Sequence, residues 1–272
     1  IGEALCPDHR VDLVSFPGSP ATGRTVMAAA AGTLKKTFLE LGGKSAYIVL
    51  DDADAATAAI GVAFQIMAHA GQGCAITTRL LVPRERHDEI VDQVIAMIGS
   101  IGWGDPTDPG NFMGPLISNT QQDRVLGYIA TAVAEGATVA TGGRIGQLTG
   151  DLAGGFFVEP TVLVGVHQDS TIAQEEVFGP VLAVIPHDGD DDAVAIANNS
   201  AFGLSGAVVS ADVERARSVA RRVRTGTIGV NGGIFYSPDV PFGGYKQSGI
   251  GREMGVAGFE EYLEIKSIAE GI

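Results

Sequence analysis

Two glycine-flanked segments each carry one residue suited to covalent or acid–base chemistry. Glu40 lies in the run Phe38-Leu-Glu-Leu-Gly-Gly-Lys44, and Cys74 ends the run Gly71-Gln-Gly-Cys74, 34 positions further along. A thiol beside glycines can sit on backbone that is open enough to admit a substrate. A carboxylate near that thiol can act as a general base for a proton or a water molecule. The pair is therefore a candidate nucleophile and base.

Alternating strand-like and helix-like segments must position this pair. Apolar runs predict strands over residues 11–16, 46–50 and 79–82, and around Thr138, Phe157, Val181 and Ala207. Capping signals and helical spacing predict helices over residues 20–31, 54–70, 84–98, 119–135, 190–198 and 212–224. Alternation on this scale predicts an α/β fold with parallel strands and helices on both faces of the sheet.

Composition and charge narrow the class of protein. The chain has 272 residues, of which 45% are hydrophobic and 18% charged, which suits one or two globular domains. Its net charge of −14 argues against nucleic acid or an anionic membrane surface as a partner. It has no run of about 18 apolar residues and no basic segment before an apolar block at its start. We therefore expect a cytoplasmic protein.

The metal-binding residue types form no familiar motif. The two cysteines, Cys6 and Cys74, give neither a CxxC pair nor a disulfide framework, and the five histidines fall in no HExxH spacing. No metal is predicted, and Cys6 is expected to be a buried structural cysteine.

The segments around the carboxylate and the thiol resemble the aldehyde dehydrogenase superfamily, in which LELGGK carries the general base and GQxC the nucleophile. The run Ser15-Phe-Pro-Gly-Ser19 is similar to the family's SFTGS cofactor turn. Residues 175–180 match its EExFGP segment, and residues 241–253 match its PFGGxKxSGxGRE segment. Five such segments in the family's order cover nearly all of the chain.

The resemblance implies a particular form of the α/β fold. We expect an aldehyde-dehydrogenase-like catalytic domain with a parallel-rich sheet flanked by helices, plus a remnant of a Rossmann-like cofactor domain. The remnant is expected at residues 1–41, the catalytic domain at 42–240, and a C-terminal return segment and oligomerisation tail at 241–272.

The chain resembles the C-terminal portion of such an enzyme, because it opens just before the cofactor turn. The family's Pro-Trp-Asn segment, which supplies an oxyanion-stabilising asparagine, is missing, as are the lysine and glutamate that hold the adenosine ribose. Loss of an oxyanion donor costs about 100- to 1,000-fold in turnover. We therefore expect the activity of this chain alone to be impaired.

The resemblance makes Cys74 the nucleophile that forms a thiohemiacetal and then a thioester with an aldehyde, using NAD or NADP. Glu40 is the general base that activates the hydrolytic water and helps deprotonate the thiol. The thiol needs such activation because its ordinary pKa is about 8.5. Family members that pass the acyl group to coenzyme A usually lack this glutamate, so hydrolysis to a carboxylic acid is favoured.

The cofactor side falls, by resemblance, on two segments. Gly18 and Ser19 form a strand-to-helix turn whose N–H groups and helix dipole favour a pyrophosphate. Pro17 stands where the family commonly has threonine, which removes a hydroxyl and an N–H donor. Glu176 would accept hydrogen bonds from the nicotinamide ribose hydroxyls, and Phe178 would lie beside the ring. The choice between NAD and NADP stays open.

Four further residues complete the predicted site. Leu41 would offer backbone contacts to the cofactor's carboxamide, while Asn231 and Phe242 resemble residues that line the substrate side. Tyr236 occupies a position where many relatives carry an aromatic residue, so it belongs either to an apolar substrate pocket or to the core. The preferred aldehyde stays open.

The tail over residues 259–268 has partial period-2 alternation through Leu263 and Ile265. An unpaired apolar strand favours association, and in the family this tail extends the sheet of a neighbouring subunit. A homo-oligomer, dimer or tetramer, is therefore expected. Two alternatives to the dehydrogenase remain: a cysteine esterase that needs no cofactor, and a folded fragment without catalytic activity.

Overall fold

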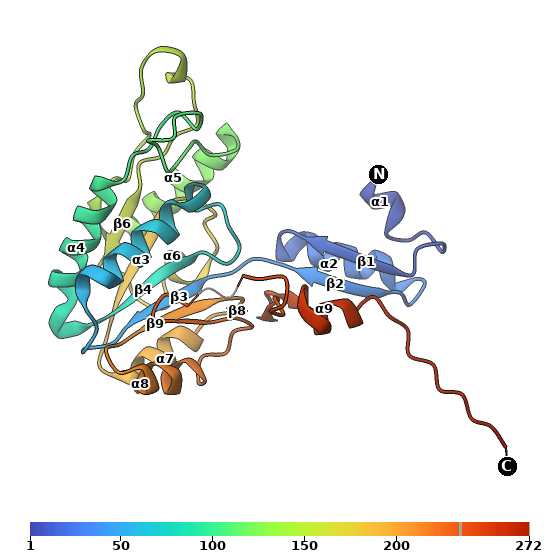
Figure 1. Ribbon diagram of the computed structural model, residues 1–272. Coiled ribbons are helices and arrows are strands. Elements are labelled where there is room, and N and C mark those ends of the chain that lie inside the picture. The colour runs from blue at the N-terminus through green and yellow to red at the C-terminus, as the bar shows by residue number, and fades with distance from the viewer. Residues whose placement is uncertain (234–235, 272) are drawn as a thin grey trace.

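The larger part of the molecule is built on a seven-stranded sheet (Figure 1). The computed structural model describes residues 1–233 and 236–271. The strand order is β10-β9-β3-β4-β7-β6-β5, and neighbouring strands run parallel except where β5 meets β6. The strands are β3 (Ser45–Val49), β4 (Thr77–Pro83), β5 (Thr138–Thr141), β6 (Thr161–Val164), β7 (Val181–His187), β9 (Gly206–Val209) and β10 (Gly229–Val230). The predicted parallel-rich α/β sheet is confirmed.

Helices cover both faces of this sheet because its crossovers run in two directions. The step from β3 to β4 moves one way along the sheet, and the step from β7 to β9 moves the other way. Right-handed crossovers then place α3 and α7 on opposite faces. The helices are α3 (Ala55–Met67), α4 (His87–Ser100), α5 (Asn119–Ala134), α6 (Thr171–Gln174), α7 (Asp190–Asn198) and α8 (Val213–Ala220).

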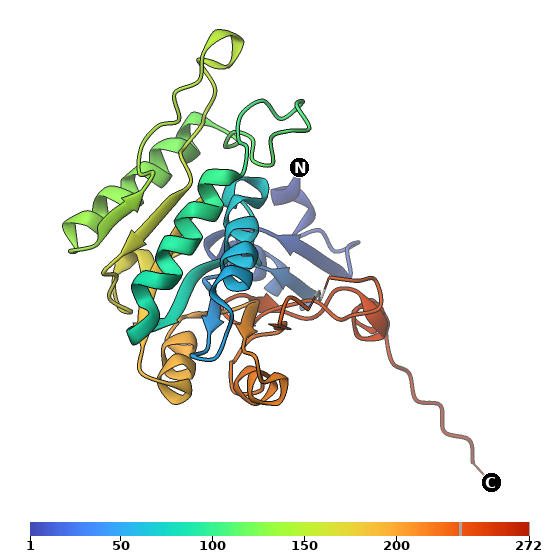
Figure 2. The ribbon, with the colours of Figure 1, turned by 60° about the vertical axis from the view of Figure 1, so that its left-hand side comes forward.

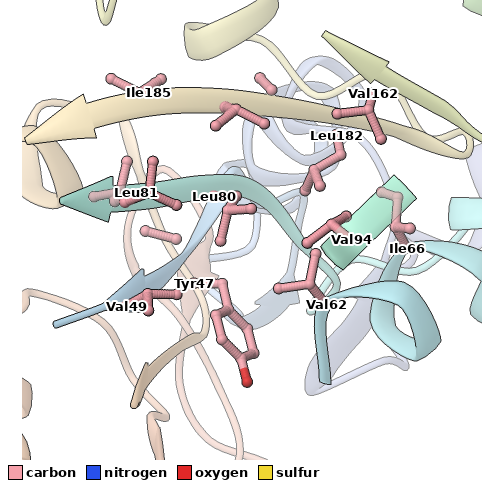
Figure 3. Packing of buried hydrophobic residues seen from close by; sticks show 14 of the residues in the cluster. Tyr47, Val49, Val62, Ile66, Leu80, Leu81, Val94, Val162, Leu182 and Ile185 are labelled. Atoms are coloured by element: carbon pink, nitrogen blue, oxygen red, sulfur yellow. The ribbon is translucent and has the colours of Figure 1, made fainter. Parts of the chain in front are cut away.

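The main core lies between the sheet and α3 and α4 (Figure 3). The buried cluster includes Leu80 and Leu81 of β4, Val62 and Ile66 of α3 and Val94 of α4, and all five are fully buried. Leu80 and Leu81 point to opposite faces of the sheet, because successive side chains of a strand alternate. Each such side chain contributes about 1.5–3 kcal/mol on burial. The strands β3, β4 and β7 are therefore a rigid base for the loops at their ends.

A second, three-stranded sheet has the order β1-β2-β12. Its strands are β1 (Leu13–Pro17), β2 (Lys36–Glu40) and β12 (Gly249–Ile250), flanked by α2 (Pro20–Ala31), while the short α1 (Gly2–Leu5) begins the chain. β1 pairs parallel and β12 antiparallel with β2. The sheet therefore combines strands from the predicted 1–41 and 241–272 segments, although the predicted domain boundaries themselves stay a prediction.

Most predicted boundaries lie within a few residues of the observed ones. Ser19 caps α2 as predicted, because its Oγ accepts a hydrogen bond from the N–H of Thr22 at 3.2 Å. Two predicted helices end early, at Met67 instead of residue 70 and at Ala220 instead of residue 224. The strand expected around Phe157 amounts to one isolated bridge, between Ile145 and Val158.

The tail forms no strand within this single chain, and its predicted pairing with a neighbouring subunit stays a prediction. Phe259 lies in the helix α9 (Gly255–Glu260), and residues 263–271 form no strand and run away from the body (Figures 1 and 2). Leu263 and Ile265 are exposed. A strand needs a partner for its backbone groups, and the described part of this chain supplies none here.

One buried cation, Arg79, and one half-buried cation, Lys246, fasten the C-terminal end of α7. The guanidinium of Arg79, which is 2% exposed, donates to the carbonyls of Lys44, Ile196 and Ala197 at 2.8–2.9 Å. Lys246, in the short strand β11 (Tyr245–Lys246) that pairs with β8 (Phe202–Gly203), donates to the carbonyls of Asn198 and Ser200. These bonds tie α7 to β3, the strand that follows Glu40.

The Arg79→Met substitution should lower the free energy of unfolding by about 2–4 kcal/mol, because it removes three hydrogen bonds from a buried guanidinium to backbone carbonyls. Urea denaturation measures the change. Arg217→Met, which removes an exposed pair with Glu214 within α8, serves as the control and should change stability by less than about 0.5 kcal/mol. Equal effects of the two substitutions would contradict the assigned role of Arg79.

Candidate active site

Glu40 ends β2 at the point where all three strands of the small sheet meet. Its partners across the sheet are Pro17 in β1 and Gly249 in β12. A Cβ atom at Gly249 would lie 1.9 Å from the carbonyl oxygen of Leu39, so only glycine lets β12 approach so closely. Backbone of Gly243 packs against the carboxylate itself, since a Cβ there would lie 2.9 Å from Glu40 Oε1.

The carboxylate of Glu40 is buried and lacks hydrogen-bond partners. The residue is 6% exposed, and neither oxygen has a partner among the residues that the structure describes. Burial and, after it, the negative charge of Glu253 raise the pKa of Glu40 to about 7, against the opposing charge of Arg252. A carboxylate with this pKa can both hold and release a proton near neutral pH, which suits a general base.

Cys74 follows a strained turn at the end of α3. His69, Ala70 and Gly71 all have left-handed backbone, with φ values of 51°, 54° and 70°. Glycine is required at position 71, because a Cβ there would lie 2.1 Å from the carbonyl oxygen of Gly179. Left-handed conformations of non-glycine residues are typical of functional sites and persist only where the surroundings hold them. The turn ends α3 early and brings the thiol to the sheet edge.

The thiol of Cys74 is half-buried and not activated in this chain. Burial raises the pKa of Cys74, and the negative charges of Glu40 and Glu176 raise it further. Only the backbone N–H groups of Cys74 and Ala75 act in the opposite direction and lower it. The resting form of the nucleophile is therefore the thiol.

The segment from Glu175 to Phe178 is fixed from two sides. The N–H of Gly43 donates to Glu176 Oε1 at 3.0 Å, and a Cβ at Gly42 would lie 2.3 Å from Glu176 Oε2. Gln121 of α5 donates through Nε2 to the carbonyls of Val177 and Phe178 at 3.0 and 2.7 Å. Phe178 is held in left-handed backbone, with φ of 59°.

Arg124, one turn further along α5, donates to the carbonyl of Glu176 at 2.9 Å. Burial raises the pKa of Glu176, whereas the Gly43 N–H, Lys44 and Arg124 lower it. The carboxylate thus has a backbone donor on Oε1 and positive charge nearby.

A cavity of about 630 Å³ joins these parts. Its volume is within the usual range for a small-molecule or cofactor site. The lining residues are Pro17, Gly18, Ser19, Glu40, Gly42, Gln72, Gly73, Cys74, Gln121, Arg124, Glu176 and Phe178. Six predicted site residues therefore share one cavity: Cys74, Glu40, Gly18, Ser19, Glu176 and Phe178.

Sequence reasoning missed Gln72, Gln121 and Arg124 as residues of this cavity. Gln121 and Arg124 lie in no glycine-rich segment. The available signal was their place in the first turns of a predicted helix, where side chains reach loops that precede or face the helix. Leu41 lies beside the cavity and packs against Gly23 of α2, where a Cβ would meet Leu41 Cδ1 at 2.9 Å.

The predicted substrate-side residues lie elsewhere. Tyr236 and Phe242 stack edge to face with ring centroids 5.7 Å apart. Tyr236 is exposed and lines a separate cavity of about 420 Å³ together with Phe64 and Ala68, whereas Phe242 is buried. Ala68 begins the turn that leads to the thiol, so this second cavity and the nucleophile loop are neighbours.

Asn231 is not among the residues that line the cavity with Cys74. Its Oδ1 accepts from the N–H of Ser210 at 3.0 Å, and its Nδ2 donates to the carbonyl of Ser210 at 2.9 Å. It lines another cavity, of about 840 Å³, at the carboxyl ends of β3 and β9 with Asp52 and Arg86. The residue joins two neighbouring strands, which is a structural role.

Lys44, four residues after Glu40, is a buried cation without a partner. It is 2% exposed, and its Nζ has no hydrogen-bond partner within residues 1–233 and 236–271. Burial and, after it, the positive charge of Arg79 lower the pKa of Lys44 to about 7, against the opposing charge of Glu176. Cys6, by contrast, is buried against Val26 and Leu39 and confirms the structural role predicted for it.

The described residues contain neither a candidate metal site nor a helix that could span a membrane. Among the described residues, no group of three or more histidine, cysteine, aspartate or glutamate side chains is arranged to hold a metal ion. The helices in that part of the chain are also too short or too polar to cross a membrane.

Comparison with known proteins identifies the family. Residues 1–268 match the model of the aldehyde dehydrogenase family. The chain is 46% identical over 268 residues to 3-succinoylsemialdehyde-pyridine dehydrogenase of a Pseudomonas species, a match that covers 98% of this chain and 56% of the relative. A putative aldehyde dehydrogenase of Staphylococcus aureus is 44% identical over 269 residues, covering 99% and 56%. This chain belongs to the aldehyde dehydrogenase family.

Solved structures agree with the fold. An aldehyde dehydrogenase of Mycobacterium tuberculosis in complex with NAD+ superposes with a TM-score of 0.90 at 48% identity, covering 95% of this chain and 53% of that one. Betaine aldehyde dehydrogenase of Staphylococcus aureus with NAD+ gives a TM-score of 0.93 at 41% identity, covering 97% and 52%. The chain spans about half the length of the relatives it matches.

The Glu40→Gln substitution should make the thiol more acidic, because it removes a negative charge that raises the pKa of Cys74. Alkylation by iodoacetamide at pH 8 should then be about three- to tenfold faster. Peptide mass spectrometry would separate Cys74 from Cys6. Glu175→Gln, a neighbouring carboxylate that accepts from the Tyr128 hydroxyl, is the control, and an unchanged rate in Glu40→Gln would contradict the electrostatic argument.

The Lys44→Met substitution should raise stability in a pH-dependent way. The pKa of Lys44 is about 7 in the folded chain against 10.5 for an ordinary lysine, so the folded state resists protonation that the unfolded state accepts. The gain should be about 1–4 kcal/mol at pH 7 and below, and fade as the pH rises toward 10.5. Urea unfolding from pH 6 to 10 tests this beside Lys36→Met, an exposed lysine. A gain that does not vary with pH would refute the explanation.

Proposed function

We propose that this chain is the catalytic portion of an NAD(P)-dependent aldehyde dehydrogenase, which oxidises an aldehyde to a carboxylic acid. The observation that carries the proposal is the shared cavity, in which Cys74 and Glu40 face Glu176 and Phe178. Two of the relatives named above are solved with NAD+. A further relative, aldehyde dehydrogenase C of Pseudomonas syringae, is solved with NAD+ and octanal at 42% identity and a TM-score of 0.92.

The residues of the cavity fit a nicotinamide cofactor. Oε1 of Glu176 is bonded to the Gly43 N–H, which leaves Oε2 to accept from ribose hydroxyls. Gly18 and Ser19 precede the twelve-residue helix α2, whose N-terminal dipole favours a phosphate group. Gly42 leaves no room for a side chain beside Glu176, so the carboxylate stays against the backbone. NAD or NADP would supply the hydride acceptor.

Cys74 and Glu40 carry the covalent and proton-transfer steps in this proposal. The thiolate attacks the aldehyde carbon, which forms a carbon–sulfur bond and a tetrahedral thiohemiacetal. Loss of hydride converts this adduct to a thioester. Glu40 takes a proton from a water molecule that attacks the thioester carbon, the carbon–sulfur bond breaks, and a carboxylic acid and the thiolate result. A base with a pKa of about 7 is about half ionised at neutral pH and largely ionised above it.

Two features support the impairment of this chain when it acts alone. The pKa of Cys74 is raised rather than lowered, so the attacking thiolate is scarce. The described residues that line the cavity also include Gln72, Gln121 and Arg124 as side-chain donors, but none is an asparagine. A bound cofactor and the remaining half of the family's length are the expected sources of the missing positive charge and oxyanion donor.

We infer a homo-oligomer, a dimer or a tetramer, from two unpaired apolar elements. The tail carries Leu263, Ile265 and Ile268, which are 46%, 97% and 81% exposed. β10 is the edge strand of the large sheet and presents one unpaired side. Pairing of the tail with a second copy would cover these apolar side chains.

Two alternatives remain testable. A cysteine esterase needs the thiol and the base but no cofactor, and both groups share the cavity. A folded fragment without catalytic activity is consistent with the protonated thiol. Ester turnover without nicotinamide favours the first, and no turnover of any substrate favours the second.

The test is NADH production by this chain with NAD+ and a panel that contains octanal and betaine aldehyde. We expect turnover at least about 100-fold below that of a full-length relative, because an oxyanion donor is missing. Cys74→Ala should abolish the residual signal, and Cys6→Ala should leave it unchanged. Glu40→Gln should accumulate a thioester on Cys74, seen as an added acyl mass in intact-protein spectra.

The outcomes of these assays distinguish the dehydrogenase from the cysteine esterase and the inactive fragment. Residual NADH formation that survives Cys74→Ala would sink the proposed mechanism. Hydrolysis of p-nitrophenyl acetate at one rate with and without NAD+, and no NADH from any aldehyde, would favour the esterase. Turnover equal to that of a full-length relative would refute the impairment.

A further inference from the structure

The side chain of Gln72, two residues before Cys74, has both ends of its carboxamide bonded to backbone. Nε2 donates to the carbonyl of His69 at 3.0 Å, and Oε1 accepts from the N–H of Ile117 at 3.0 Å. The first bond ties the side chain of Gln72 to the turn that precedes Cys74. The second joins that loop to a segment 45 residues further along the chain.

The turn at this side chain has a backbone conformation that neighbouring groups must stabilise. His69 and Ala70 are non-glycine residues in left-handed conformation, and Gly71 continues it. Such residues persist only where neighbouring groups hold them. Three contacts do so here: the carboxamide of Gln72, the backbone N–H of Gln72, which donates to the same His69 carbonyl at 3.1 Å, and the carbonyl of Gly179, which lies against Gly71. Without the first, the loop has one fewer anchor on the side that leads to Cys74.

Ile117 stands at the start of α5, the helix that also fixes the cofactor side. Ser118 caps that helix, with its Oγ accepting from the N–H of Gln121. Gln121 in turn donates to the carbonyls of Val177 and Phe178. The first turn of α5 therefore holds the nucleophile loop through Gln72 and the segment of Glu176 and Phe178 through Gln121. Both glutamines line the cavity.

We propose that Gln72 is a positioning residue, which fixes the loop of Cys74 against the start of α5 and so sets the place of the thiol relative to the Glu176–Phe178 segment. It acts through backbone bonds and takes no part in proton transfer. This inference rests on the proposed function in one respect, that Cys74 is the nucleophile.

The test uses this chain and the Gln72→Met substitution, which keeps the length of the side chain and removes both bonds. Three quantities are measured: the pH profile of Cys74 alkylation by iodoacetamide, the hydrogen exchange rate of the Ile117 amide, and the urea midpoint. We expect the Ile117 amide to exchange about tenfold faster, as loss of one hydrogen bond allows. The released loop should bring alkylation closer to that of an ordinary thiol, with a rate at pH 7.5 raised about fivefold or more.

Asn198→Leu is the matched control. The carboxamide of Asn198 also bridges backbone groups, donating to the carbonyl of Arg222 at 3.0 Å and accepting from the N–H of Arg224 at 2.7 Å, but it lies at the end of α7. The Asn198→Leu substitution should lower the urea midpoint and leave Cys74 alkylation and Ile117 exchange unchanged. Gln72→Glu, which keeps an acceptor for Ile117 but no donor for His69, should keep the Ile117 amide protected from exchange.

Ile117→Pro removes the donor from the opposite side and carries the test if Gln72→Met does not fold. It should speed alkylation of Cys74 in the same direction, and its combination with Gln72→Met should add little, because both substitutions break the same bond between Gln72 and Ile117. The proposal is overturned if Gln72→Met leaves alkylation and Ile117 exchange within twofold of the original chain. It is also overturned if Asn198→Leu changes them equally. Neither readout needs hydride transfer, so a failed dehydrogenase assay leaves this result interpretable.

Discussion

The structure depends on burying the carboxylate of Glu40 where three distant strands meet. β1, β2 and β12 converge on this residue, and the glycines at 243 and 249 let backbone come close enough to exclude water from it. A buried carboxylate without hydrogen-bond partners destabilises the fold, so the surrounding contacts must hold it in place. What the molecule gains is a carboxylate with a pKa of about 7, which an exposed glutamate does not have.

The same burial has an opposite effect on the nucleophile. Cys74 is half-buried beside the carboxylates of Glu40 and Glu176, and all three influences favour its protonated form. Positive charge exists nearby in Lys44 and Arg79, but Arg79 is bound to carbonyls and burial lowers the pKa of Lys44 to about 7. The cavity is thus well suited to a base and poorly suited to a thiolate until another positive group enters it.

Much of the fold could be predicted from local sequence, since Ser19, Pro20 and the apolar runs of the strands act over a few residues. Glu40, Cys74 and Glu176 could be predicted as site residues from short segments that match the family's motifs in the family's order. The early end of α3 could not be predicted, because its cause is the contact of Gly71 with Gly179, more than a hundred residues away. The contributions of Gln72 and Gln121 depend likewise on carbonyls and N–H groups that only the folded chain brings near. The alternating pattern of the tail predicts a strand, yet the tail has no neighbouring strand to pair with in the described part of a single chain.

The pairing of β12 with β2 has a consequence for the order in which the molecule is assembled. It joins Glu40 to Gly249, so a loop of roughly 200 residues must close before the small sheet is complete, and such long-range pairs form late in folding. During synthesis, β12 leaves the ribosome only after the whole of the large sheet. The large sheet and its core can therefore form while Glu40 is still exposed to water, and the general base acquires its unusual pKa as one of the last events of folding.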